Sequence, residues 1–511
     1  MLSILFDIWK ILTKRDKYII FGFLFLLIFQ GGFELIGVFS ILPLFSVISN
    51  PKLIETNATL NYIYNNFNFS NLTGFIIFLT LGALIVISFR IFITFFSNFL
   101  LFRFIRSRNH SISLRLLKTY VAQPYYFFLN KHTAYLGKKI LSEVQDVVSG
   151  CLFPFLELFA HINILLFFLF GAIAFAPSII IYSIGIILVF YGLVFYLISD
   201  KAEHFGSSKN KLDGKRFKVI QEVFSGIKEI KLNGNENFYF KEYGKFSLKY
   251  EQALTKLIFY KEFPKYLLEF LSFVFILGTV VYLTSTGGGS IEKVLPTLSA
   301  LALGGKRILP STQKIYKSIL FIKFSAPAVR LLKKDLLELN RHTKKVKVKP
   351  LNIKESVEFK NISFYYENTS KPSLKNLSLE IKSNSIIGIV GSTGAGKSTI
   401  VDLLSGLLTP SSGEILIDKK PLKSNNVESW QKSLGYIPQQ IFIADDTITN
   451  NIALGINSQD IDFEKVKNAA RKAMIYDFIM EDLPNKFNTS LGEKGVRISG
   501  GQRQRIGLAR A

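Results

Sequence analysis

Six long apolar stretches most constrain what this chain can fold into. They occupy residues 18–47, 74–105, 150–175, 178–198, 263–284 and 291–322, and Pro177 separates the third from the fourth by a very short turn. Each reaches the roughly 20 residues that a helix needs to cross the hydrocarbon of a bilayer. Because backbone polar groups in lipid must be satisfied internally, the sequence predicts an all-α polytopic membrane domain with six transmembrane helices over residues 1–328.

The distribution of charge predicts how this domain is oriented. Lysine and arginine collect before the first stretch, between the second and third, and between the fourth and fifth, whereas the alternate loops offer little beyond Lys52 and Lys293. Cytoplasmic loops carry such an excess, so both termini are expected in the cytoplasm. The same bias accounts for the formal net charge of +25, and no nucleic-acid partner is expected.

Segments between the stretches carry further expectations. Residues 1–17 mix apolar and charged side chains in the manner of an amphipathic helix at the inner membrane face. The inner segments 106–149 and 200–262 have helical apolar spacing, which predicts long extensions into water with transverse helices near 124–134 and 233–243. For the outer loop, residues 50–73, two alternatives remain: a small surface helix or a polar loop. The single Cys151 excludes an intramolecular disulfide.

The pattern changes after Ala328. Residues 329–350 are highly charged and are interpreted as a helix tail and linker. From residue 351 to residue 511, short β-rich runs alternate with helical patterns, which predicts a soluble α/β domain.

A phosphate-binding loop lies in this second domain. Its residues are Gly391, Ser392, Thr393, Gly394, Ala395, Gly396, Lys397, Ser398 and Thr399. The loop follows a strand-like run, 385–390, and opens a helical run, 397–408, which is the context that phosphate binding requires. Backbone N–H groups and the helix start would bind phosphates. Lys397 would neutralise the β- and γ-phosphates, and Ser398 would offer its hydroxyl to Mg²⁺. ATP or GTP binding is therefore expected.

Further short motifs resemble those of ABC ATPases. The run that contains Ser499, Gly500, Gly501 and Gln502 resembles the family's signature sequence, with Ile498 where Leu is usual. Pro438-Gln439 after the strand-like run 434–437 resembles the Q-loop. Tyr366 resembles the aromatic A-loop residue that stacks on adenine, and Glu493 resembles the exporter motif that touches the membrane domain. The second domain therefore resembles an α/β P-loop NTPase domain of ABC type, and the six-helix layout resembles that of ABC exporters.

This resemblance implies an ATPase-coupled transporter that acts as a homodimer. Ser499, Gly500, Gly501 and Gln502 would contact ATP held by the partner's phosphate loop, and Gln439 would serve catalysis and Mg²⁺ binding beside Ser398. The Walker B carboxylates and the switch histidine of the family are absent from the 511 residues. The 511-residue chain is therefore expected to hydrolyse ATP poorly, and the complete gene product is expected to continue.

Ionisable residues inside the apolar stretches bear on the substrate, because an ionisable group at the bilayer centre is costly and is usually functional. The candidates among them are Glu34, Arg90, Lys265, Lys306, Arg307 and Lys314. For Lys265 and Lys314, snorkelling to headgroups explains the position equally well. Together the cations would suit phosphate or pyrophosphate, which arginine binds bidentately.

The surroundings of these residues resemble bacterial lipid-linked oligosaccharide flippases. The resemblance covers the segments around Glu34, Arg90, Lys265 and Arg307, and it implies a polyprenyl-pyrophosphate-linked oligosaccharide or related lipid as substrate in a bacterial inner membrane. A general lipid, drug or peptide exporter remains open. A non-hydrolysing nucleotide-binding membrane protein also remains open.

Overall fold

Two compact units make up the structure, which is a computed structural model and describes residues 1–69, 71–175, 177–286, 291–339, 348–367 and 369–511. The membrane unit comprises residues 1–123 and 127–343, and the nucleotide unit comprises residues 124–126 and 344–511. The division between residues 343 and 344 falls inside the linker expected at 329–350.

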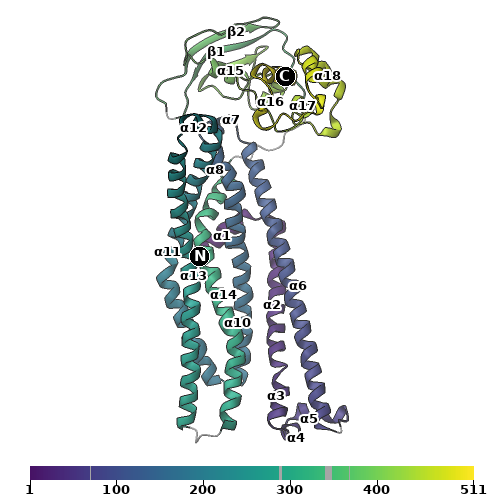
Figure 1. The fold of residues 1–511 in the computed structure, drawn as a ribbon, viewed down its shortest axis with the longest axis vertical. Coiled ribbons are helices and arrows are strands. Elements are labelled where there is room, and N and C mark those ends of the chain that lie inside the picture. Colours follow the sequence, from purple (N-terminus) through teal and green to yellow (C-terminus); the bar gives the residue numbers. More distant parts are fainter. Residues whose placement is uncertain (70, 176, 287–290, 340–347, 368) are drawn as a thin grey trace. The chain divides into compact units, whose positions relative to one another are not determined.

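Long helices that run side by side build the membrane unit (Figure 1). They are α2 (Lys14–Phe39), continued by α3 (Leu42–Ser49), then α6 (Leu72–Val121), α10 (Phe153–Phe175), α11 (Pro177–Ser225), α13 (Glu236–Thr286) and α14 (Ile291–Leu337). Because α6 has 50 residues, it is about 75 Å long, more than twice the thickness of the bilayer hydrocarbon. In the described part of the chain, three segments have the length and hydropathy to cross a membrane: Lys14–Ile48, Leu72–Val121 and Thr133–Gly171. Long apolar helices are therefore confirmed at these three segments, and the predicted stretches 178–198, 263–284 and 291–322 lie within α11, α13 and α14.

Short helices connect the long ones. They are α1 (Leu2–Ile11), α4 (Leu53–Thr56), α5 (Ala58–Asn66), α7 (Tyr125–Leu129), α8 (Thr133–Lys138), α9 (Val144–Val147) and α12 (Ile227–Asn233), with π-helical turns at Lys139–Glu143 and Val148–Leu152. A helix is present at the expected N-terminal segment, as α1, and at the expected turning point near 124–134, as α7. The outer loop forms α4 and α5 rather than an irregular polar loop.

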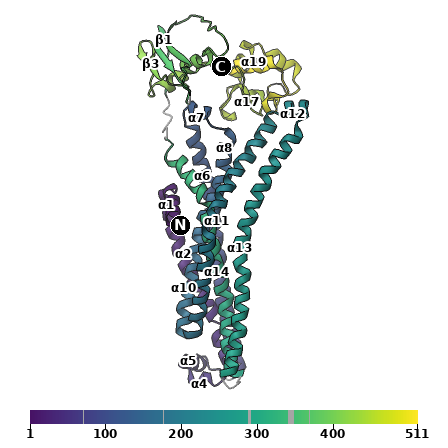
Figure 2. The same cartoon turned by 90° about the vertical axis from the view of Figure 1, so that its left-hand side faces the viewer.

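The second turning point differs from the expectation at residues 233–243. The short helix is α12, which joins α11 to α13 (Figure 2), and most of the expected range belongs to the start of α13. Gly234 explains the difference, because it caps α12 in the left-handed region at φ +63°. Glycine adopts that conformation without the steric penalty of a Cβ atom, so the turn is made before residue 236.

The core of the membrane unit lies where α1, α2, α6, α9, α10 and α14 meet. Ile8, Leu116, Val148 and Val329 are among its buried members. A capping box between Thr13 and Asp16 starts α2 directly after α1. This arrangement fixes α1 against the membrane helices at the point where the chain turns into α2.

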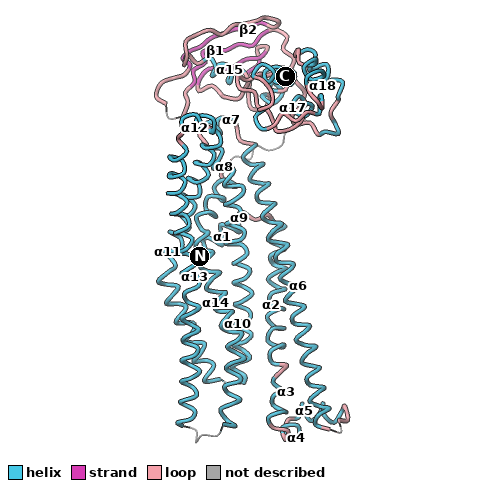
Figure 3. Tube along the Cα trace, in the orientation of Figure 1, coloured by secondary structure: helices cyan, strands magenta, loops and turns pink. Residues whose placement is uncertain are grey.

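Strands occur only in the nucleotide unit among the described residues (Figure 3). The sheet has the order β2-β1-β3-β4 and is antiparallel, with strands β1 (Ser356–Phe364), β2 (Leu374–Lys382), β3 (Ser412–Ile417) and β4 (Lys420–Pro421). The helices are α15 (Lys397–Leu404), α16 (Val427–Gln431), α17 (Ile448–Ile452), α18 (Phe463–Lys472) and α19 (Gly500–Arg510), with shorter turns at Ser458–Asp460, Phe478–Asp482, Lys486–Asn488 and Glu493–Gly495.

Two of the expected strands are absent from this sheet. Neither 385–390 nor 434–437 forms strand hydrogen bonds, although both have strand-like sequences. Several of their side chains are open to solvent, and Ile386 and Val390 are 102% and 92% exposed, whereas Ile389 and Leu434 pack against the core of the nucleotide unit. A strand exists only with a hydrogen-bonding neighbour, and no described segment of the chain pairs with either run.

Candidate functional site

The phosphate loop of the nucleotide unit has the backbone geometry of an anion site. Gly394 and Gly396 lie in the left-handed region, at φ +86° and +85°, and Gly396 is the N-cap of α15 without a side-chain cap. The first N–H groups of α15 therefore face the loop without a capping acceptor from a side chain. Such N–H groups, reinforced by the helix dipole, are suited to binding phosphate.

Glycine is required at position 396 for a second reason. A Cβ atom there would lie 2.8 Å from the carbonyl oxygen of Ser373 and 2.8 Å from the side chain of Leu374. The residue before β2 therefore packs directly against the backbone of the loop, and only a residue without a side chain fits.

Lys397 is held inside the loop by the loop's own backbone. Its ammonium group donates to the carbonyl oxygens of Gly391 at 2.9 Å and Ser392 at 2.7 Å. A terminal phosphate could replace these neutral acceptors with charged ones, and hydrogen bonds to ionised acceptors are roughly twice as strong. The geometry therefore holds the ammonium group of Lys397 within the loop, beside Gly391 and Ser392.

Tyr366 lies beside the same loop. Its hydroxyl group is 3.1 Å from the hydroxyl of Thr399, which is buried in the first turn of α15. The ring packs edge to face on Phe364 at a centroid distance of 4.9 Å. The structure thus brings together Tyr366 and the phosphate loop, two elements that 24 intervening residues separate in the sequence between Tyr366 and Gly391.

The signature residues form the start of α19. The hydroxyl of Ser499 accepts from the backbone N–H of Gln502 at 3.3 Å, and the Gln502 side chain accepts from the backbone N–H of Ser499 at 2.7 Å. This capping box fixes the first turn. A Cβ atom at Gly500 or Gly501 would meet nothing within 4 Å, so packing within the chain does not require either glycine.

Gln439 and Glu493 occupy loops. Gln439 is exposed and lies outside any helix or strand, and Glu493 begins the turn Glu493–Gly495. Mg²⁺ prefers oxygen ligands and usually completes its shell with waters and substrate phosphates. The hydroxyl of Ser398 and the amide oxygen of Gln439 are of the right chemical type, and the described residues contain no cluster of three or more His, Cys, Asp or Glu that would form a self-sufficient metal site.

A second polar cluster lies within the apolar helices of the membrane unit. Arg90 on α6 donates from Nη1 to the carboxylate of Glu34 on α2 at 2.9 Å, and the hydroxyl of Thr94 donates to the same carboxylate at 3.2 Å. The side chains of Arg90 and Glu34 are 13% and 7% exposed. A Cβ atom at Gly37 would lie 2.5 Å from Cδ of Arg90, so the glycine makes room for the arginine.

The other predicted cavity cations do not share one cluster with Arg90. Lys314 on α14 pairs with Glu157 on α10, and Lys265 lies over the ring of Tyr266 at 5.7 Å. Lys306 and Arg307 fall in α14 at positions whose side chains lie outside the described residues. Of the expected cationic lining, Arg90 and Lys314 are therefore paired with carboxylates, whereas Lys265 lies over an aromatic ring.

Two partners in these clusters, Thr94 and Glu157, are not among the site residues predicted from the sequence. Thr94 lies one turn after Arg90 on the same helix face, and Glu157 is an acidic residue inside the third apolar stretch. Both had a signal in the sequence, since helix neighbours at i, i+4 share a face and an acidic residue in a membrane stretch is usually paired.

These features define a membrane protein with a phosphate-binding ATPase-like unit, and comparison with known proteins identifies its family. The model described as "ABC transporter transmembrane region" matches residues 39–304, and the model described as "ABC transporter" matches residues 374–511. The chain belongs to the ABC transporter family. Its fold is that of an ABC exporter membrane domain joined to an ABC nucleotide-binding domain, as expected from the sequence.

Individual relatives agree with this assignment. Human ATP-binding cassette sub-family B member 5 is 47% identical over 166 residues, which are 32% of this chain and 13% of that protein. The ATP-dependent lipid A-core flippase of Wigglesworthia glossinidia brevipalpis is 25% identical over 415 residues, 78% of this chain and 68% of that protein. A solved bacterial Atm1-family ABC exporter with ATP bound matches with a TM-score of 0.72 at 21% identity, over 93% of this chain and 82% of that chain. The chain thus spans only 13% of the length of the human relative.

Proposed function

We propose that this protein is one half of a homodimeric, ATP-driven exporter that moves a lipid across a bacterial inner membrane, with both termini in the cytoplasm. Two observations support the nucleotide part of the proposal. The phosphate loop has uncapped N–H groups at the start of α15, with Lys397 inside the loop. The start of α19 presents Gly500 and Gly501 to open space, which suits contact with a nucleotide held by a second copy.

Within this proposal the residues have separate tasks. The loop N–H groups and Lys397 hold the phosphates, and Tyr366 orients the adenine beside Thr399. Ser398 and Gln439 would hold Mg²⁺, which neutralises charge that develops on the transferred phosphoryl group. Ser499 fixes the first turn of α19 so that its N–H groups point at the partner's nucleotide.

The Arg90–Glu34 pair is the observation that supports a lipid with a phosphate or pyrophosphate group as substrate. A buried guanidinium in membrane helices is a fork that binds phosphate bidentately. A pyrophosphate that reaches Arg90 would replace Glu34 as its acceptor, and the carboxylate would keep its contact with Thr94 at 3.2 Å. Polyprenyl-pyrophosphate-linked oligosaccharides and related lipids carry this group, and the lipid A-core flippase names of several relatives support a lipid substrate more broadly.

Substrate-stimulated ATP hydrolysis by the full-length gene product in proteoliposomes tests this proposal. Stimulation by a polyprenyl-pyrophosphate glycan is expected in the parent and is expected to fall at least about tenfold in Arg90→Ala, because one bidentate phosphate contact is lost. Arg103→Ala is the matched control, since Arg103 is exposed on the same helix. Equal stimulation by hydrophobic amines, unaffected by Arg90→Ala, would instead favour a general drug or peptide exporter.

The expectation of poor hydrolysis by the 511-residue chain stays a prediction. Magnesium-dependent release of inorganic phosphate by this chain measures it. Binding of a fluorescent ATP analogue without such release would agree with the prediction, whereas steady turnover would contradict it.

A further inference from the structure

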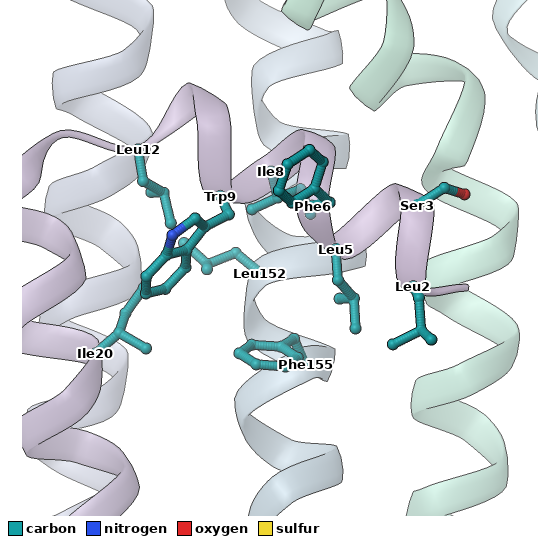
Figure 4. A pocket seen from close by; sticks show the side chains of 10 residues that line it. All are labelled: Leu2, Ser3, Leu5, Phe6, Ile8, Trp9, Leu12, Ile20, Leu152 and Phe155. Carbon is teal, nitrogen blue, oxygen red and sulfur yellow. The ribbon is translucent and has the colours of Figure 1, made fainter.

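An apolar groove runs beneath the N-terminal helix of the membrane unit. It encloses about 580 Å³ and is lined by Leu2, Ser3, Leu5, Phe6, Ile8, Trp9, Leu12, Ile20, Leu152 and Phe155. Trp9 and Ile20 lie together at one end, Leu2 lies at the other, and Leu5 and Phe155 lie between them (Figure 4). All of the lining residues except Ser3 are apolar, so the groove offers contact surface to a hydrocarbon and almost nothing to a polar ligand.

Helix α1 is anchored on one side and open on the other. Ile4 and Ile11 are buried in the core to which α14 also contributes, and Asp7 pairs with Lys333 of α14 at 2.7 Å. The groove side, by contrast, keeps Leu2 80% exposed and Phe6 58% exposed. The contacts on the buried side therefore hold α1 in place, and its exposed side is available to a ligand.

The ammonium groups of two lysines lie close to aromatic rings that line the groove. Nζ of Lys10 is 4.4 Å from the ring centroid of Phe6, and Nζ of Lys17 is 5.1 Å from that of Trp9. Neither lysine forms an ion pair with a described residue. The nearby carboxylates are already engaged, since Asp7 binds Lys333 and Asp16 binds Arg108.

We propose that this groove is a binding site for an anionic membrane phospholipid, with one acyl chain along the apolar lining and the headgroup phosphate beside Lys10 and Lys17. An interfacial amphipathic helix places its apolar face at the boundary between headgroups and acyl chains, where both parts of such a lipid are present. The two unpaired ammonium groups favour an anionic headgroup, and each lysine near a membrane surface favours anionic lipid by about fivefold. The site requires only that the long helices span a membrane, so it is independent of the transported substrate.

Trp9 provides a direct probe of the groove. The protein has only two tryptophans, Trp9 and Trp430, and Trp430 is 2% exposed in the nucleotide unit. The experiment reconstitutes the full chain in phosphatidylcholine vesicles that contain increasing fractions of a lipid with brominated acyl chains, either phosphatidylglycerol or phosphatidylcholine. The part of the quenching that is lost in Trp9→Phe reports occupancy of the groove.

The expected result is half-maximal quenching of Trp9 at a brominated phosphatidylglycerol fraction at least about fivefold lower than for brominated phosphatidylcholine. Lys10→Gln plus Lys17→Gln should abolish this difference. Lys14→Gln plus Arg15→Gln is the matched control, because these exposed cations lie on the same segment but over no ring of the groove, and it should keep the difference. Equal quenching by the two lipids in the parent, or an equal loss of preference in both double variants, would overturn the proposal.

Discussion

Replacing Arg90 by alanine is expected to destabilise the membrane unit more than any exposed substitution on α6. In the structure Glu34 is 5% exposed and accepts from Arg90 at 2.9 Å and from Thr94 at 3.2 Å. Removing the guanidinium takes the positive charge of the arginine away from the buried carboxylate, to which the hydroxyl of Thr94 still donates. Breaking a buried ion pair on one side costs about 3–5 kcal/mol, whereas individual hydrogen bonds between membrane helices contribute about 0.6 kcal/mol on average.

The charge left behind, rather than the lost contact, should account for most of this loss. The double variant Glu34→Gln plus Arg90→Ala removes the orphaned charge and should therefore recover about 2 kcal/mol relative to Arg90→Ala alone. Unfolding of the purified chain in mixed micelles of increasing SDS fraction, followed by circular dichroism of the helices, measures both values. Arg103→Ala, at an exposed position on the same helix, should stay within about 0.5 kcal/mol of the parent.

Unfolding of Arg90→Ala and of the double variant at the same SDS fraction would contradict this prediction. That result would mean that Glu34 bears no uncompensated charge in the single variant. A single variant as stable as the parent would show that the pair contributes nothing to the packing of α2 against α6.

Three further predictions concern the nucleotide unit. Gly396→Ala should weaken binding of a fluorescent ATP analogue by about tenfold or more, because its Cβ would lie 2.8 Å from the carbonyl oxygen of Ser373 at a backbone φ of +85°; unchanged affinity would contradict this. Ser499→Ala should lower the free energy of unfolding by about 1 kcal/mol through loss of the helix cap, and Ser499→Asp should restore most of it, as urea titration would show. Three backbone N–H groups of residues 354–356 donate to the carboxylate of Asp418 and lower its pKa. The stabilisation by Asp418 is therefore full above the ordinary pKa of an unfolded aspartate, about 3.9, and is lost as pH falls through the lower folded pKa; Asp418→Asn should flatten this dependence in urea titrations between pH 2 and pH 6.

The long helices could be predicted from sequence because their cause is local. A stretch of about 20 apolar residues has one stable form in lipid, and the phosphate loop carries its own backbone requirements in its glycines. The turn between α11 and α13 was misplaced because the apolar spacing continues through it. The turn depends on the left-handed conformation of Gly234. The sequence alone does not distinguish a glycine that ends a helix from one that lies inside it.

Ion pairs between residues that lie far apart in the chain could not be predicted from the sequence. The sequence predicts Glu34 and Arg90 each as an ionisable residue inside an apolar stretch, but their pairing depends on the rotation of α2 against α6. Lys314 and Glu157 are likewise separated by 157 positions. The absence of strands at 385–390 and 434–437 has the same origin. A strand-like sequence only favours the extended conformation, and the strand that would pair with it must come from elsewhere in the fold.

The segment 385–390 has a practical consequence for handling this chain. It reads Ser-Ile-Ile-Gly-Ile-Val, without charge or proline, and its backbone donors and acceptors are not used by the sheet. Short uncharged β-prone segments of this kind are templates for cross-β association, and lysine is the residue that natural edge strands use to prevent it. Concentrated samples of the 511-residue chain should therefore precipitate through this segment first, and Ile386→Lys, at a side chain that is 102% exposed, should keep them in solution.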